Sequence, residues 1–170
     1  MGKKSKEIAL AGMLTALAVV ILFLGSLVEL LDLSAAAMAA LVVMVALIEL
    51  GKGKAFAVYL ASSLLAVLLF PKTASVVFAA FLGYYPVLKV YLDKLRPKVL
   101  QYMAKLVLFN VFLALILWIT EGLLGLSSDW GSLGKALFLL GNMAFILYDF
   151  AIGRLAVFYI VKIKNRIRKR

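Results

Sequence analysis

Six long apolar stretches divide the chain and leave almost no sequence for a soluble core. They cover residues 7–28, 34–50, 54–70, 74–93, 103–124 and 135–161. Each has roughly the 17 to 25 residues that a helix needs to cross a bilayer core of about 30 Å. Hydrophobic residues make up 66% of the chain, against about half in a soluble domain. The sequence therefore predicts an all-α integral membrane protein whose six transmembrane helices form a single domain over residues 1–170.

Lysine and arginine residues gather on one side of these stretches. They occupy the start of the chain, the connections around residues 52–54 and 94–98, and the tail "KIKNRIRKR", and Lys105 is counted with them. The alternate connections carry only Lys72 and Lys135. Because positively charged loops stay inside, we expect a multi-pass cell-membrane protein with both termini in the cytoplasm. The net charge of +11 then reflects orientation and does not indicate nucleic-acid binding.

The composition also limits the chemistry. The chain has no cysteine and no histidine, so it lacks thiolates, the commonest general base and the commonest transition-metal ligand. It contains no phosphate-binding glycine loop, no carboxylate pair with metal-ligand spacing and no nucleophile elbow. We therefore expect no catalytic residue, no cofactor and no metal site, and any ATP hydrolysis would belong to partner subunits.

The stretch "GYYPVLK", residues 83–89, interrupts the fourth apolar span. Pro86 in the middle of a helix removes a backbone donor and frees the carbonyl of Leu82. The hydroxyls of Tyr84 and Tyr85 are close enough in sequence to satisfy what the bend exposes, and Gly83 permits a close helix contact. The stretch is interpreted as a bend that supplies its own polar partners.

Ionisable residues inside spans are costly and need named partners. At 1.5 Å per residue, Lys89 lies about 22 Å and Asp149 about 20 Å below the outer surface. We expect these two to form a buried ion pair. Arg154 either reaches the cytoplasmic headgroups or serves as the alternative partner, and a transported-ion or substrate role stays open. The expected intramembrane polar brace is Tyr84, Tyr85, Lys89, Asp149 and Arg154.

Each of the last two spans carries a polar stripe, because residues seven or eleven apart lie within about 20° of one helix face. The pairs are Asn142 with Asp149 and Asn110 with Glu121. Hydrogen bonds between helices would explain them. The neighbouring outer loop, however, is acidic and carries Trp130, with Trp118 just before it, so an outward-open small-molecule pocket is the competing interpretation. In that interpretation the two tryptophans form the rim of the pocket, whereas otherwise they belong to the usual belt of aromatic residues at the membrane interface.

The first span has a face of small residues that includes Gly12 and Ala16, and the second repeats the spacing with Ala36 and Ala40. Small residues four apart allow another helix to approach closely. Together with six spans and the opening segment "KEIALAGMLTALAVV", this face resembles the substrate-specificity subunit, or S component, of energy-coupling factor (ECF) transporters. The resemblance covers almost the whole chain as an architecture, with short motifs.

The resemblance implies a function and partners. An S component binds a vitamin, a vitamin precursor or a related small nutrient near the outer face, and docks through its first helix on a transmembrane coupling subunit driven by two cytoplasmic ATPases. Carried over, Gly12 and Ala16 would contact the coupling subunit. Trp118, Glu121, Trp130 and Asn142 would lie near a vitamin-like or nucleobase-like substrate. The family's Ala-x-x-x-Ala pattern stands here as Gly12-x-x-x-Ala16, and the N-terminal histidine of its cobalt and nickel branch is absent, which disfavours metal substrates.

Two other classes of function stay open. One is a histidine-independent membrane enzyme that uses Asp149, Glu121 or Lys89 on a lipid-linked substrate. The other is a structural membrane-assembly protein whose helices pack in a larger complex among the lipids. A small molecule bound to the purified chain would favour the substrate-binding subunit over both of these alternatives.

Overall fold

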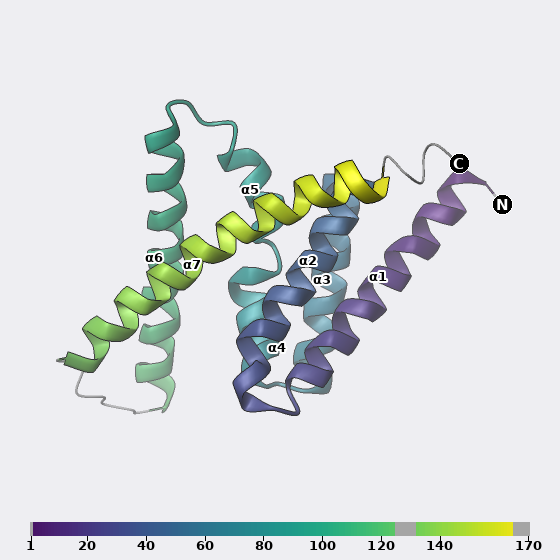
Figure 1. The fold of residues 1–170 in the computed structure, drawn as a ribbon. Coiled ribbons are helices and arrows are strands. Elements are labelled where there is room, and N and C mark those ends of the chain that lie inside the picture. Colours follow the sequence, from purple (N-terminus) through teal and green to yellow (C-terminus); the bar gives the residue numbers. More distant parts are fainter. Residues whose placement is uncertain (1, 125–131, 165–170) are drawn as a thin grey trace. The chain divides into compact units, whose positions relative to one another are not determined.

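The computed structural model describes residues 2–124 and 132–164, which are almost entirely helical and contain no strand (Figure 1). The α-helices are α1 (Lys3–Gly25), α2 (Asp32–Leu50), α3 (Lys52–Leu69), α4 (Thr73–Val77), α5 (Tyr85–Leu92), α6 (Lys98–Leu124) and α7 (Ser132–Phe158). A 3₁₀ turn, η1 (Glu29–Leu31), precedes α2, and π-helical segments follow α4 and α7 at η2 (Phe78–Leu82) and η3 (Tyr159–Lys164). Within the described residues, six helical spans are long and apolar enough to cross a membrane, which confirms the predicted all-α membrane class.

The chain divides into two compact units, Met1–Val90 with Ile152–Arg170, and Tyr91–Ala151. The expectation of a single membrane domain therefore stays a prediction. So does the cytoplasmic position of both termini, because length and composition identify a span without giving its direction. The two units are described one at a time below.

In the first unit, α1 packs against α2 and α3, and α2 packs against α3 and α4 (Figure 1). The predicted small pair Ala36 and Ala40 is fully buried in this packing. At the end of α1, a Cβ on Gly25 would lie only 2.0 Å from the Cβ of Ala35, so only glycine fits this crossing. Small side chains let the helix backbones come close together and increase their van der Waals contact.

Polar contacts tie this bundle together at both ends. Near the beginnings of α1 and α3, Glu7 and Lys54 form an ion pair. Beyond the ends of the same two helices, the Lys72 ammonium donates a hydrogen bond to the Ser26 carbonyl at 2.8 Å. Helices α1 and α3 therefore run in the same direction, with α2 returning between them.

The fourth span is broken into α4, the π segment η2 and α5. Pro86 lies inside the helical span Thr73–Leu92, as predicted, but in the first turn of α5, where a missing N–H costs least. The extra residue per turn comes instead from η2, where the Gly83 amide donates to the Phe78 carbonyl at 2.8 Å. The predicted close contact at Gly83 is present: a Cβ there would lie 2.7 Å from the ring of Tyr59.

Tyr59 on α3 supplies a polar partner for this irregular segment. Its hydroxyl donates to the Ala79 carbonyl at 2.6 Å, and its ring packs edge-on against Tyr84 with centroids 5.7 Å apart. Tyr85 is fully buried. A hydroxyl from the neighbouring helix thus stabilises the π segment, and hydrogen bonding by the hydroxyls of Tyr84 and Tyr85 stays a prediction.

Candidate functional site

The second unit is held together by a buried ion pair between α6 and α7. Lys105 is only 3% exposed, and its ammonium donates to both carboxylate oxygens of Asp149, at 3.2 Å and 3.1 Å. The same ammonium lies 2.6 Å from a carboxylate oxygen of Asp93, just after α5. Gln101 also donates to this Asp93 oxygen at 2.6 Å. The carboxylates of Asp93 and Asp149 therefore share one lysine, and Asp93 is the more exposed of the two.

Two further layers continue this contact along the helices. The rings of Phe109 and Phe145 stack with centroids 4.6 Å apart and an interplanar angle of 6°. Beyond them, the side chains of Asn110 and Asn142 exchange hydrogen bonds, at 2.9 Å and 3.1 Å. The pairing is that of antiparallel helices, because residue numbers increase along α6 while those of their partners decrease along α7.

The asparagine layer is also anchored to its own helices. The side-chain amide of Asn110 donates to the Leu106 carbonyl at 2.8 Å, and that of Asn142 to the Phe138 carbonyl at 2.9 Å. Both amides are partly buried, and amides withdrawn from water are stable only when such bonds are made. We name this set the α6–α7 ladder, defined as Lys105, Asp149, Phe109, Phe145, Asn110 and Asn142.

The ladder gives Asp149 a partner that the sequence analysis did not name. Sequence reasoning offered Lys89 or Arg154, whereas the structure pairs Asp149 with Lys105. A contact between Lys89 and Asp149 would join the two units and stays a prediction. Within the first unit, the Lys89 side chain ends beside α7, with its Cε 3.8 Å from where a Cβ of Gly153 would lie. Arg154, the next residue, is exposed.

Lys105 is the residue that sequence reasoning missed. It was counted with the basic residues that mark orientation, although it falls inside the predicted span 103–124. An ionisable residue inside a span is itself a signal of a buried partner. That signal, applied to Lys105 as it was to Lys89, would have placed it in the polar network.

Of the four residues predicted to contact the substrate, the structure describes the side chain of only one. Asn142 lies on α7 and bonds to Asn110, as the interhelical interpretation expects. The side chains of Trp118 and Glu121, and residue Trp130, lie outside the described residues. The outward-open pocket between the last two spans therefore stays a prediction.

The predicted docking face on α1 is uncovered within the first unit. Gly12 and Ala16 are exposed, and a Cβ on Gly12 would meet no atom within 4 Å. The opposite side of α1, with Leu14, Ala18 and Leu22, is buried. One side of α1 thus packs into the bundle while its small residues lie on the outside.

Comparison with known proteins adds no further identification. No family model, no curated protein and no solved structure matches the chain.

Proposed function

We propose that this chain is the substrate-binding subunit, or S component, of an ECF-type importer for a small organic nutrient, such as a vitamin, a vitamin precursor or a nucleobase-like compound. It would reside in the cell membrane with both termini in the cytoplasm. A transmembrane coupling subunit and two cytoplasmic ATPases would drive it, and it would not itself be an enzyme. The six apolar spans support its place in the membrane.

The observation that carries this proposal is the uncovered small-residue face of α1. A helix surface that faces only lipid gains nothing from small side chains, because large apolar side chains are solvated equally well by lipid tails. Gly12 and Ala16 instead allow a second helix to come within close backbone distance. Their neighbours Met13 and Leu17 are exposed apolar side chains that would flank such a contact. A membrane partner that docks here fits the coupling subunit of the resembled family.

The proposed substrate site lies near the outer ends of α6 and α7, with Trp118, Glu121, Trp130 and Asn142 as its contacts. The α6–α7 ladder supports this position by holding the two helices in one register beneath the site. A rigid supporting layer keeps binding groups in place and reduces the entropy that a ligand must lose on binding.

Co-purification tests the docking role. The chain is co-expressed with a coupling subunit and its two ATPases, and the complex is isolated through a tag on an ATPase. Gly12→Leu and Ala16→Leu should each greatly reduce recovery of the chain, because a leucine blocks close approach. Ala57→Leu is the matched control, since Ala57 is an exposed alanine on α3. Equal recovery of all variants, or no recovery of the unmodified chain, would reject the docking role.

Mass spectrometry of the purified chain tests the substrate role. A nutrient of low molecular mass should be released in stoichiometric amount on denaturation. Recovery of the chain with an unrelated membrane complex and no released molecule would favour the assembly interpretation instead.

A further inference from the structure

An open groove lies in the first unit, at the end of the bundle where Lys72 contacts Ser26. It has a volume of about 700 Å³ and is lined by residues of the α1–α2 and α3–α4 connections and by the first residues of α2 and α4. They are Leu30, Asp32, Leu33, Pro71, Lys72 and Thr73. Cavities that hold small molecules have volumes of about 300 to 1,000 Å³, with apolar walls and a few polar groups. The volume of the groove falls in this range, and three of its six lining residues, Asp32, Lys72 and Thr73, are polar or charged.

Asp32 is the unusual member of this lining. It is the first residue of α2 and is only 9% exposed, yet its Oδ1 is buried with no hydrogen-bond partner among the described residues. An unsatisfied buried polar atom costs about 1 to 3 kcal/mol, and more when it is charged. The partial positive charge at the α2 N-terminus offsets part of this cost without filling the hydrogen-bonding position.

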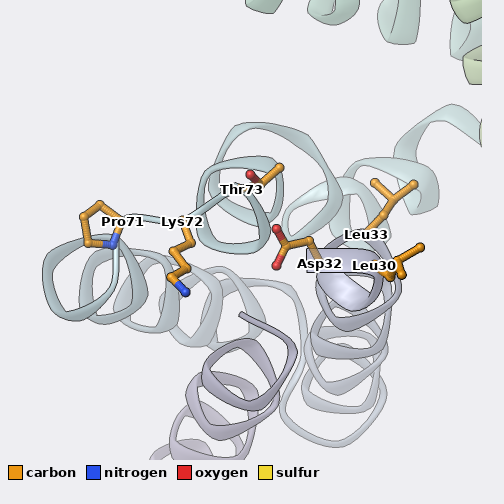
Figure 2. Close-up of a pocket in the computed structure, with 6 residues that line it drawn as sticks. All are labelled: Leu30, Asp32, Leu33, Pro71, Lys72 and Thr73. Atoms are coloured by element: carbon orange, nitrogen blue, oxygen red, sulfur yellow. The ribbon is translucent and has the colours of Figure 1, made fainter. Parts of the chain in front are cut away.

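Lys72, the candidate partner for Asp32 in the groove, forms its hydrogen bond with another residue. Lys72 lines the same groove, but its ammonium donates to the Ser26 carbonyl, and no ion pair between Lys72 and Asp32 is found in the described part of the chain. Figure 2 shows the Asp32 carboxylate turned into the space beside Lys72 and Thr73, while the end of the Lys72 side chain lies away from it. Asp32 therefore lines the groove, while Lys72 forms its hydrogen bond with Ser26 instead of with this carboxylate.

We propose that this groove binds a small organic molecule through a protonated amine, with Asp32 as the acceptor. An ammonium group supplies both the positive charge and the N–H donor that a desolvated carboxylate lacks. Leu30, Leu33 and Pro71 would contact a short apolar body attached to the amine. The inference goes beyond the proposed function, because none of the proposed nutrient contacts lines this groove.

A neutral or anionic ligand fits the groove less well. A hydroxyl could donate one hydrogen bond, but it would leave the carboxylate charge without compensation. A carboxylate ligand would be repelled by Asp32, whatever it gained from Lys72. Selectivity for the amine over the alcohol is therefore the property that distinguishes this site from a general apolar groove.

The experiment compares three probes with the same apolar body. Benzylamine, benzyl alcohol and benzoate are titrated against the full chain in nanodiscs of zwitterionic lipid, and binding is followed by ligand-observed NMR. Empty nanodiscs correct for partition into lipid. A charge-assisted hydrogen bond predicts that benzylamine binds about tenfold or more tightly than benzyl alcohol. Benzoate should bind most weakly of the three.

Asp32→Asn keeps the shape of the side chain and should abolish the preference for benzylamine. The matched control is Glu7→Gln, which removes one negative charge from the ion pair at the opposite end of the bundle and should leave the preference intact. Leu30→Trp provides a second variant that does not touch the carboxylate. Leu30 is 92% exposed, so the added ring should obstruct the groove without disturbing the core.

Thermal unfolding supplies an independent readout. If Asp32 is kept for a ligand, Asp32→Asn should unfold at the same or a higher temperature in the absence of probe, because an unpaired buried charge is removed. A clear loss of stability would show that the carboxylate braces the fold. Equal binding of amine and alcohol, or a preference that survives Asp32→Asn, would overturn the inference.

The two proposals fail separately. Intact amine selectivity without recovery by a coupling subunit would reject the importer role and leave the groove site standing. Recovery by the coupling subunit without amine selectivity would reject the groove site alone.

Discussion

The ammonium of Lys105 contacts both carboxylate oxygens of Asp149, and this buried ion pair joins α6 to α7. Lysine is 3% exposed and aspartate 7%, so both charges are withdrawn from solvent and lipid alike. Such a pair adds little net stability compared with apolar residues, but removal of one member is costly, since the other keeps its charge in a poorly solvating environment.

Lys105→Met should therefore lower the free energy of unfolding by about 3 kcal/mol, measured by titration with SDS from a mild detergent. The control is Lys54→Met, which breaks the exposed ion pair with Glu7 and should cost under about 1 kcal/mol. The double variant Lys105→Met/Asp149→Leu should recover most of the loss. Similar losses for Lys105→Met and Lys54→Met would contradict a buried role for the first pair.

A double-mutant cycle on Asn110 and Asn142 measures the amide layer. Asn110→Ala, Asn142→Ala and the double variant should give a coupling free energy of about 1 kcal/mol, the usual range for hydrogen bonds between membrane helices. The same variants separate structure from substrate contact. If Asn142 also binds the nutrient, Asn142→Ala should weaken binding well beyond Asn110→Ala, whereas equal effects would assign the residue to the ladder alone.

Gly83→Ala should destabilise the first unit by about 1 to 3 kcal/mol through overpacking. The added Cβ would lie 2.8 Å from the Phe78 carbonyl oxygen and 2.7 Å from the Tyr59 ring, and the backbone atom cannot rotate away. Thermal unfolding in detergent is a suitable measurement. Gly53→Ala is the comparison, because its Cβ would meet nothing within 4 Å and alanine favours a helix. A tolerated Gly83→Ala would mean that η2 and α3 are not packed this closely.

Single cysteines test the orientation that the basic residues predict. The chain has no cysteine, so each introduced thiol is unique. In intact cells, a membrane-impermeant maleimide should label Leu30→Cys, which is 92% exposed beyond α1, and should spare Ser5→Cys until the cells are opened. The reverse pattern would invert the topology and place the Asp32 groove on the cytoplasmic side.

The membrane class and the six spans could be predicted because hydropathy is a local property of the chain. About 20 consecutive apolar residues determine a span whatever its neighbours are. The exact ends of the helices were less predictable. The span expected at 103–124 belongs to a helix that begins at Lys98, because polar residues at a helix end are tolerated near the membrane interface. The contact at Gly83 was also expected, because glycine lets a neighbouring helix approach closely.

The sequence by itself determined that charge would be buried at Asp149, but it did not identify Lys105 as a partner. Lys89 and Asp149 were matched by depth, yet depth is one coordinate, and only the packing of α6 on α7 brought Lys105 to Asp149. The break in the fourth span has the same origin, since Tyr59 on α3 satisfies a carbonyl in η2 and α5 then begins at Tyr85, with Pro86 in its first turn. The unpaired Asp32 oxygen likewise depends on how the segments leading into α2 and α4 lie around the groove. Pairing depends on distances between segments remote in sequence, and tertiary structure decides those distances.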